Sequence, residues 1–330
     1  MDIGWFRAGI VIVFFNAIVL GGLGILSGAI STAGAAPRQE PFYAGFGEID
    51  LVKNHFLLVG DTQKTSAWEF WRERNEKERK RIIDEMARRN PAFIVHLGDL
   101  TARGSSRKHW EEFDDLNKEL RDKRVPYFPI LGNHEFYGDN GEALGHYFAR
   151  LSHLQNRRWY SFTWKGVALI LLDSNFANLS PEEIEEQENW YLTELERFEK
   201  DDRVDHVIVC CHEPPYTNSR AISPSEKSRR YFADPFVRFQ KTSLFFSGHG
   251  HTYERFQMRD KFFIVTGGGG GPRHRIYIDP GKRRFEDLFS GPELRFFHFC
   301  EIEVHGTKLN YKVLRLEPDG TFTVVDPLRR

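Results

Sequence analysis

Short polar clusters follow five separate apolar stretches of the chain. They contain Asp, Asn, Gln and His, whose carboxylate oxygen, amide oxygen and imidazole nitrogen bind metal ions. The clusters are Asp61-Thr62-Gln63, Gly98-Asp99, Gly132-Asn133-His134-Glu135, His212-Glu213 and Gly248-His249-Gly250-His251. A single Gly-Asp after a strand can simply make a turn, but five such clusters in one chain indicate a shared site.

This donor set indicates two metal ions. Mixed oxygen and imidazole ligands suit Mn, Fe, Zn or Co better than Cu(I) or an iron–sulfur cluster, for which thiolates would be expected. Asp61 and Gln63 are two residues apart and could reach one ion. His249 and His251 have the same spacing and point to one side if the backbone there is extended. Six or seven ligands are too many for one tetrahedral ion, so two ions bridged by one carboxylate are the economical interpretation.

The elements that must position these clusters are strands, because ligands bind beyond the carboxyl ends of strands in open α/β sheets. Apolar runs predict strands over 55–59, 93–97, 125–131, 206–211 and 244–247, and a hairpin over 159–164 and 167–172. Helices are predicted over 68–89, 108–121 and 181–200. Strands dominate after residue 255, which predicts an α/β (α+β) fold with a two-sheet sandwich flanked by helices.

Composition narrows the class of protein. The 330 residues include 46 basic and 47 acidic side chains, for a formal net charge of -1. This balance gives no global attraction to nucleic acid, and no nucleic-acid partner is expected. The three cysteines, two of them adjacent, cannot build a disulfide framework or a zinc finger. No partner protein is predicted.

The N-terminal 40 residues form a separate segment. No charged residue occurs from Ala8 to Pro37, and the apolar stretch is long enough to cross a bilayer as a helix. Residues 1–40 are therefore predicted to be a transmembrane anchor or a cleaved signal segment, with a buried helix as the remaining alternative. Residues 41–330 would be the catalytic domain, extracytoplasmic and membrane-anchored, or secreted if the segment is cleaved.

The ordered clusters resemble the motifs of the calcineurin-like metallophosphoesterase superfamily, which run D-x-[HQ], GDxxxxG, GNH[ED], a lone His after a strand, and GHxH. The resemblance spans Asp61 to His251 and implies the fold of that family. The tail from Gly248 to Arg255 is similar to that of purple acid phosphatases. Those enzymes need a Tyr three residues after the bridging Asp, but Ala102 stands there, so no tyrosinate ligand is expected.

The resemblance implies a role for each matched residue. The first metal would be held by Asp61, Gln63, Asp99 and His251. The second would be held by Asp99, Asn133, His212 and His249. Asp99 would bridge the two ions, and a hydroxide shared between them would attack phosphorus. His134 would bind the phosphoryl group or protonate the leaving oxygen, so Asp99 and His134 are the predicted catalytic residues.

Three further residues are candidates for contact with an anionic substrate. Arg103 matches a phosphate-binding Arg of phosphoprotein phosphatases, although a solvated loop arginine is as good an interpretation. Those enzymes have Asp where Ala102 stands, so His134 lacks that acidic partner. Arg273 and His274 follow the five glycines 267–271, which form either a substrate-side loop or a merely flexible one.

The sequence thus predicts a two-metal phosphoesterase that acts on phosphomonoesters. The alternative is a phosphodiesterase for nucleotides, glycerophosphodiesters or a lipid head group, since one metal centre can do either and the pocket walls decide. A catalytically silent binding protein is the contrasting possibility, because fold alone does not fix function.

Overall fold

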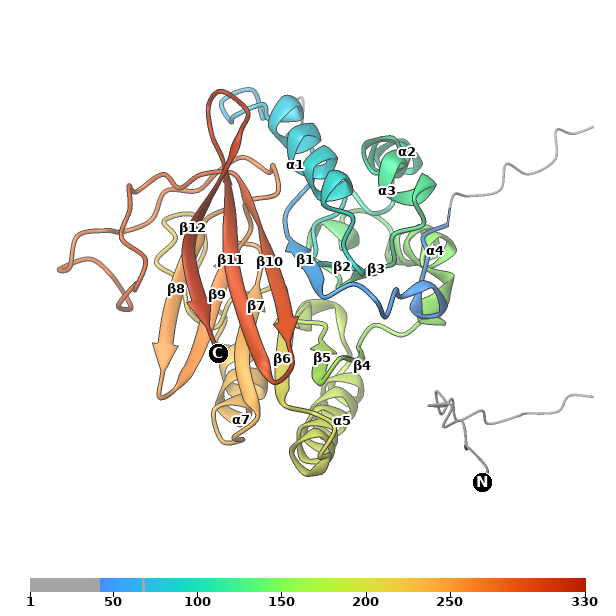
Figure 1. Ribbon diagram of the computed structural model, residues 1–330. Coiled ribbons are helices and arrows are strands. Elements are labelled where there is room, and N and C mark those ends of the chain that lie inside the picture. Colours follow the sequence, from blue (N-terminus) through green and yellow to red (C-terminus); the bar gives the residue numbers. More distant parts are fainter. Residues whose placement is uncertain (1–41, 67–68) are drawn as a thin grey trace, which may run out of the picture. The chain divides into compact units, whose positions relative to one another are not determined.

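A six-stranded mixed sheet forms from strands at both ends of the described chain (Figure 1). The computed structural model describes residues 42–66 and 69–330. The sheet order is β12-β11-β10-β1-β2-β3, and β1 pairs in parallel with β2, and β2 with β3. The strands are β1 (His55–Val59), β2 (Ile94–His96), β3 (Tyr127–Pro129), β10 (His298–His305), β11 (Lys308–Leu316) and β12 (Phe322–Arg329).

A second six-stranded mixed sheet has the order β4-β5-β6-β7-β9-β8. Its four central strands are parallel, and the two edge strands are antiparallel to their neighbours. The strands are β4 (Tyr160–Trp164), β5 (Val167–Leu171), β6 (His206–Cys211), β7 (Thr242–Ser247), β8 (Tyr253–Met258) and β9 (Lys261–Thr266). Every polar cluster singled out in the sequence begins within three residues of the end of a parallel strand of one of the two sheets.

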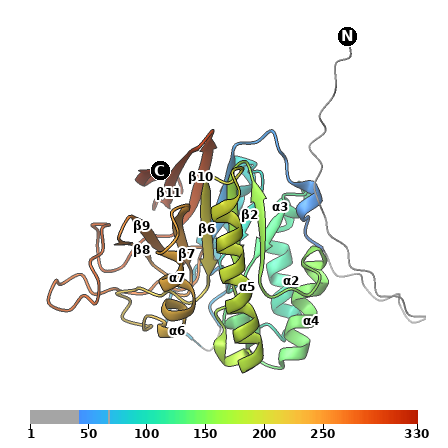
Figure 2. The same cartoon turned by 90° about the horizontal axis from the view of Figure 1, so that it is seen from below.

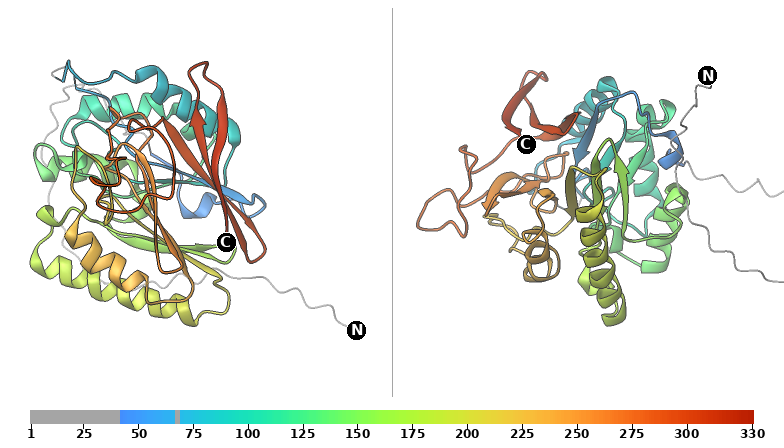
Figure 3. Two further views of the ribbon diagram at one scale, coloured as in Figure 1. Left: turned by 90° about the vertical axis from the view of Figure 1, so that its left-hand side faces the viewer. Right: turned by 60° about the horizontal axis from the view of Figure 1, so that its bottom comes forward.

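Helices cover both sheets. Figure 1 shows α1 to α4 beside β1, β2 and β3, while α5 accompanies the second sheet. Figures 2 and 3 show α5 running along that sheet beside the helical segment 226–236. The helices are α1 (Glu76–Arg89), α2 (Arg107–Leu116), α3 (Lys118–Asp122), α4 (Asn140–Arg150), α5 (Pro181–Lys200), α6 (Glu226–Ser228) and α7 (Asp234–Phe236), with a π-helical turn at Arg229–Ala233 between the last two.

The second sheet separates two hydrophobic clusters. Along β5, Val167, Leu169 and Leu171 belong to the larger cluster, which includes the first sheet and α1. The alternate residues Ala168 and Ile170 belong to the smaller cluster with α5. Because a strand turns successive side chains to opposite faces, β5 is apolar at every position and buried throughout.

Several sequence-based element bounds are confirmed. Strands 55–59 and 206–211 and helix 181–200 begin and end where predicted. The helix begins with a capping box, in which Ser180 and Glu183 each bond the backbone N–H of the other. Two mixed sheets with flanking helices agree with the predicted fold class.

Two helix predictions need correction, and one helix was not predicted. Helix 68–89 begins only at Glu76, because tertiary contacts hold the preceding segment: the Thr65 hydroxyl donates to the Glu73 backbone oxygen (2.7 Å). Helix 108–121 is two helices divided at Asn117, whose side-chain amide donates to a backbone oxygen of α2 (2.9 Å). The sequence predicted no helix at 140–150, where α4 lies, capped by Asp139.

The predicted N-terminal anchor or signal segment, residues 1–40, lies outside the described residues. Within 42–66 and 69–330, no helix combines the length and the apolar character that crossing a bilayer requires.

Candidate metal centre

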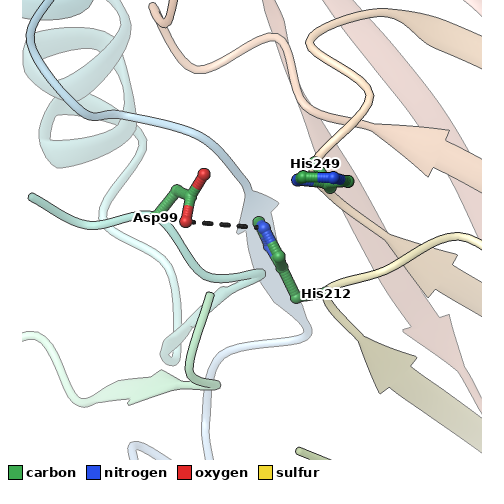
Figure 4. A group of neighbouring side chains, drawn as sticks. All are labelled: Asp99, His212 and His249. Carbon is green, nitrogen blue, oxygen red and sulfur yellow. Dashed lines mark ion pairs between the residues drawn. The ribbon is translucent and has the colours of Figure 1, made fainter. Parts of the chain in front are cut away.

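The polar clusters converge where the carboxyl ends of parallel strands from both sheets meet. One group of potential ligands is Asp99, His212 and His249, and a second is Asp61, Asp99 and His251. Within each group the ligand atoms all lie within 4.8 Å of one another. Figure 4 shows the first group, with Asp99 and His212 facing each other. Asp99 is common to both groups, which is the arrangement that a bridging carboxylate requires.

Two amide side chains complete the cluster. The Asn133 Oδ1 lies 3.1 Å from Nε2 of His212. The Gln63 Nε2 lies 3.1 Å from Oδ2 of Asp99 and 2.9 Å from Nε2 of His251. The structure therefore brings all seven sequence-predicted metal ligands together.

Backbone carbonyls orient two of the imidazoles. The Nδ1 of His212 lies 2.7 Å from the Leu97 oxygen, and the Nδ1 of His251 lies 2.8 Å from the Pro272 oxygen. Each Nδ1–H donates to its carbonyl, so Nε2 of both rings faces the centre. Hydrogen bonds of this kind fix the tautomer and ring direction of metal-binding histidines.

Left-handed backbone conformations are concentrated at the candidate ligands. Asp61, Asp99, His249 and His251 have φ angles of 61°, 57°, 61° and 36°. Residues other than glycine rarely adopt these values, and each such residue costs about 1–3 kcal/mol unless its surroundings fix it. The ligand carboxylates supply part of that support. Asp61 accepts hydrogen bonds from the His249 backbone N–H at 3.0 Å to both oxygens, and Asp99 accepts one from the backbone N–H of His134 at 2.9 Å.

The buried carboxylate of Glu135 holds the loop on which Asp99 lies. It accepts hydrogen bonds from the backbone N–H groups of Asp99 (2.8 Å), Leu100 (2.9 Å), Thr101 (3.2 Å) and Gly132 (2.8 Å). Burial and, secondarily, Asp99 raise the pKa of Glu135 to about 8. Its four donors fix the ends of β2 and β3 relative to each other.

The negative charges of two buried carboxylates favour the binding of cations at this centre. Asp61 and Asp99 are fully buried, and among the described residues their ion-pair partners are histidines only, never Lys or Arg. Burial opposes the charged forms of both Asp99 and His212. Nevertheless His212, and then His134, hold the pKa of Asp99 below its usual range, and Asp99 raises that of His212.

A buried amide oxygen without a hydrogen-bond partner also favours bound cations. Within the described residues the buried Oε1 of Gln63 has no hydrogen-bond partner, while its Nε2 faces Asp99 and His251. A half-turn of the amide would direct this oxygen to the centre. The seven side chains therefore fit two ions with mixed oxygen and nitrogen coordination.

His134 lies at the edge of the cluster with one ring nitrogen toward it. Its Nε2 is 3.8 Å from Oδ2 of Asp99, and its Nδ1 is 3.0 Å from the backbone oxygen of Ala102. The sequence left His134 without an acidic partner at position 102. In the structure the backbone carbonyl of that residue orients the ring instead.

Tyr137 is a site residue that sequence reasoning missed. Its hydroxyl accepts a hydrogen bond from Nδ2 of Asn133 (2.8 Å), which turns the amide oxygen toward His212. Its ring lies 4.4 Å from the His134 ring, tilted by 42°. Only its place just after the Asn133-His134 cluster could have signalled this role.

Tyr137→Phe is expected to weaken the binding of one of two metal ions by roughly tenfold or more, the effect typical of losing a group that orients a ligand. The reason is that Asn133 loses the acceptor that fixes its amide. Competition with a chromophoric chelator measures the affinity. Tyr277→Phe, a half-buried tyrosine that does not line the cavity described next, is the matched control; equal affinities for the two variants would contradict the role of Tyr137.

A cavity of about 890 Å³ opens onto the centre. Arg103, His134 and His274 line it together with Asp99, Asn133, His249 and His251. His274 stacks on His251, with ring centroids 4.4 Å apart and an angle of 8° between the planes. Arg103 is exposed, and its guanidinium Nε donates a hydrogen bond to the Ser105 hydroxyl (3.3 Å).

Arg273 is placed differently from the other candidates for substrate contact. Its guanidinium pairs with Glu73 (2.6 Å), donates to the Arg295 backbone oxygen (3.0 Å) and lies over the Phe297 ring. It is not among the described residues that line the cavity. Its contacts hold the glycine-rich loop to the segment before α1, which is a structural role.

Gly267, the first glycine of that loop, has no room for a side chain. A Cβ there would lie 2.5 Å from Oδ2 of Asp61 and 2.7 Å from the His251 backbone nitrogen. Gly267→Ala is expected to lower the free energy of unfolding by about 1–3 kcal/mol, as overpacking does, and to weaken metal binding by displacing Asp61. Thermal unfolding and metal titration check both effects. Gly145→Ala, where a Cβ meets nothing within 4 Å, is the control.

Comparison with known proteins agrees with this geometry. A family model described as calcineurin-like phosphoesterase matches residues 55–253, more than half of the chain. Purple acid phosphatase 21 of Arabidopsis thaliana is 28% identical over 235 residues, which cover 67% of this chain and 51% of that protein. The chain spans about half the length, or less, of the first curated relatives it matches.

Solved structures share the fold. A purple acid phosphatase from yellow lupin (Lupinus luteus) seeds superposes with a TM-score of 0.61 at 16% identity, covering 84% of this chain and 53% of its own. GAP50, described as the anchor in the inner membrane complex of Plasmodium, superposes with a TM-score of 0.59 at 20% identity, covering 84% of this chain and 88% of its own.

Proposed function

The chain belongs to the calcineurin-like phosphoesterase family, and from this premise we propose that it is a two-metal-dependent hydrolase of phosphomonoesters. The observation that carries the proposal is the position of Asp99, which belongs to both groups of potential metal ligands. A single carboxylate with that position can hold two cations at one phosphate-binding site.

Each ion would have its own set of side chains. One ion would be held by Asp61, Gln63, Asp99 and His251. The other would be held by Asp99, Asn133, His212 and His249. Bound ions of this kind lower the pKa of water and neutralise charge on a phosphoryl group. Gln63 is a neutral ligand, so its ion should be held less tightly than one with a fourth charged or imidazole ligand in place of the amide.

His134 would handle the proton of the leaving group. Because its Nδ1 faces the Ala102 carbonyl, Nδ1–H is held there and Nε2 is the nitrogen that gains and loses a proton. A general acid at this place protonates the leaving oxygen as the ester bond breaks, which contributes roughly 10²–10⁴-fold to the rate. Tyr137 would keep the ring in place by packing on it.

A phosphodiesterase remains the second candidate, and the size of the cavity supports it. A volume of about 890 Å³ leaves room for two ester groups beside the metal centre. Nucleotides, glycerophosphodiesters or a lipid head group would be substrates of this kind.

The uncharged segment 8–37 supports one further part of the proposal. It would place the catalytic domain outside the cytoplasm, held at a membrane or released after cleavage. This part rests on the sequence alone.

The test uses the full-length chain, purified in detergent without chelator. Metal content is measured first. 4-Nitrophenyl phosphate and bis(4-nitrophenyl) phosphate are then assayed side by side with Mn, Zn, Fe and Mg added separately. Two metals per chain and faster monoester hydrolysis would support the main proposal, and faster diester hydrolysis the second. A folded protein with neither metal nor turnover would favour a silent binding protein.

A further inference from the structure

One wall of the cavity at the metal centre carries more basic side chains than there are acidic side chains to pair with them. Apart from Asp99 at the centre, two acidic side chains line the cavity, Glu69 and Glu112, against four basic ones, Lys64, Arg72, Arg103 and Lys108. Lys64 pairs with Glu112 (3.5 Å) and Arg72 with Glu69 (3.2 Å). Arg103 and Lys108 form no ion pair among the described residues. Two exposed cations therefore face the cavity unbalanced.

The positive charges of these side chains also affect the pKa of a neighbouring histidine. His109, on α2, also lines the cavity. Burial is the largest cause that lowers its pKa, and Lys108, Lys64 and Arg103 lower it further against the opposing effect of Glu112. Cations from three parts of the chain thus act on one region of the wall.

This wall is fixed relative to His134. The Gly104 N–H donates to the His134 backbone oxygen (2.9 Å), and the Ser105 N–H donates to that of Tyr137 (3.2 Å). The indole N–H of Trp110 in α2 donates to the Gly104 oxygen (2.7 Å). The loop that carries Arg103 and the helix that carries Lys108 are therefore both tied to the residue proposed to protonate the leaving group.

We propose that Arg103 and Lys108 form a subsite for a second anionic group of the substrate, on the leaving-group side of the metal centre. This inference rests on the proposed function and adds a substrate class to it. The preferred substrates are phosphomonoesters whose leaving group carries a further phosphate or a carboxylate. A neutral leaving group leaves the two cations without a partner.

The expected size of the preference for a doubly anionic ligand follows from the affinity that exposed ion pairs contribute. Each such pair contributes at most about fivefold to affinity, so two cations give a preference of roughly tenfold for a doubly anionic ligand. Because the pairs are solvent-exposed, the preference should shrink as salt concentration rises.

Binding to the metal-loaded full-length chain tests the subsite without requiring turnover. Calorimetry compares methylphosphonate with an alkylene bisphosphonate and with a phosphonocarboxylate of matched length. The two doubly anionic probes distinguish a second phosphate from a carboxylate. The variants are Arg103→Gln, Lys108→Gln and the double substitution. Lys77→Gln is the control, since Lys77 is exposed on α1, forms no ion pair among the described residues and does not line the cavity.

The expected result is a preference for at least one doubly anionic probe that falls stepwise in the single and double variants but not in Lys77→Gln. The inference is overturned if the wild-type chain binds metal and methylphosphonate yet shows no preference, or if the double variant keeps it. Failure of the wild-type chain to bind metal or any phosphonate would instead overturn the proposed function, and the subsite with it.

Discussion

Replacing Asp99 by asparagine should reduce phosphoester hydrolysis by roughly 10³-fold or more, since bound metal ions contribute several kcal/mol of charge stabilisation in the transition state. Asp99 is the one carboxylate shared by both groups of potential ligands. Asparagine has nearly the same shape as aspartate, but it lacks the negative charge that two cations would share. Metal content should therefore fall below two ions per chain.

The measurement is turnover and metal content of the variant beside a matched control. Asp122→Asn removes a carboxylate from the exposed surface of α3 and should change neither quantity. If Asp99→Asn keeps two ions and near-wild-type turnover, Asp99 does not bridge, and the two-ion proposal loses the observation that carries it.

Replacing His134 by alanine should lower turnover by roughly 10²–10⁴-fold, the contribution of a positioned general acid, and leave metal content intact. His134 lies at the edge of the cluster, and its Nε2 is 3.8 Å from the nearer Asp99 oxygen. Its loss removes a proton donor but no ligand. A substrate with a good leaving group, such as 4-nitrophenyl phosphate, should suffer less than an alkyl phosphate, because its leaving oxygen needs less protonation.

The comparison of these two substrates separates catalysis from structure. Loss of metal in His134→Ala would make His134 a structural or ligating residue. An equal loss of turnover on both substrates would argue against proton transfer to the leaving oxygen. His305→Ala, an exposed histidine on β10 beside Glu303, is the control and should behave as the wild-type chain.

Strand ends were the part of the site that could be predicted from sequence. Apolar runs such as 206–211 are long enough to be recognised, and each one ends in a polar cluster. Parallel strands of one sheet place their carboxyl ends at one edge, so Asp61 and Asp99 were expected to lie close together once β1 and β2 were identified as neighbours. Helix α5 was equally predictable, because Ser180 and Pro181 mark its beginning.

Side-chain partners far apart in the sequence could not be predicted. Arg273 pairs with Glu73, which lies 200 residues away, and nothing local marks either residue as engaged. The same contact helps to keep the segment before Glu76 out of helix α1, although its composition is helical. Tyr137 was missed for a related reason, since its role depends on where the Asn133 amide points.

The centre takes its ligands from both sheets. Asp61 and Asp99 follow strands of the first sheet, while His212 and His249 follow strands of the second. An ion bound by both is therefore a cross-link that only the assembled domain can make, and neither half of the chain alone would offer the full set. By mass action, an ion present at 100 times its dissociation constant adds about 2.7 kcal/mol to the free energy of unfolding. Metal supply would then set the stability of the folded domain as well as its catalytic capacity.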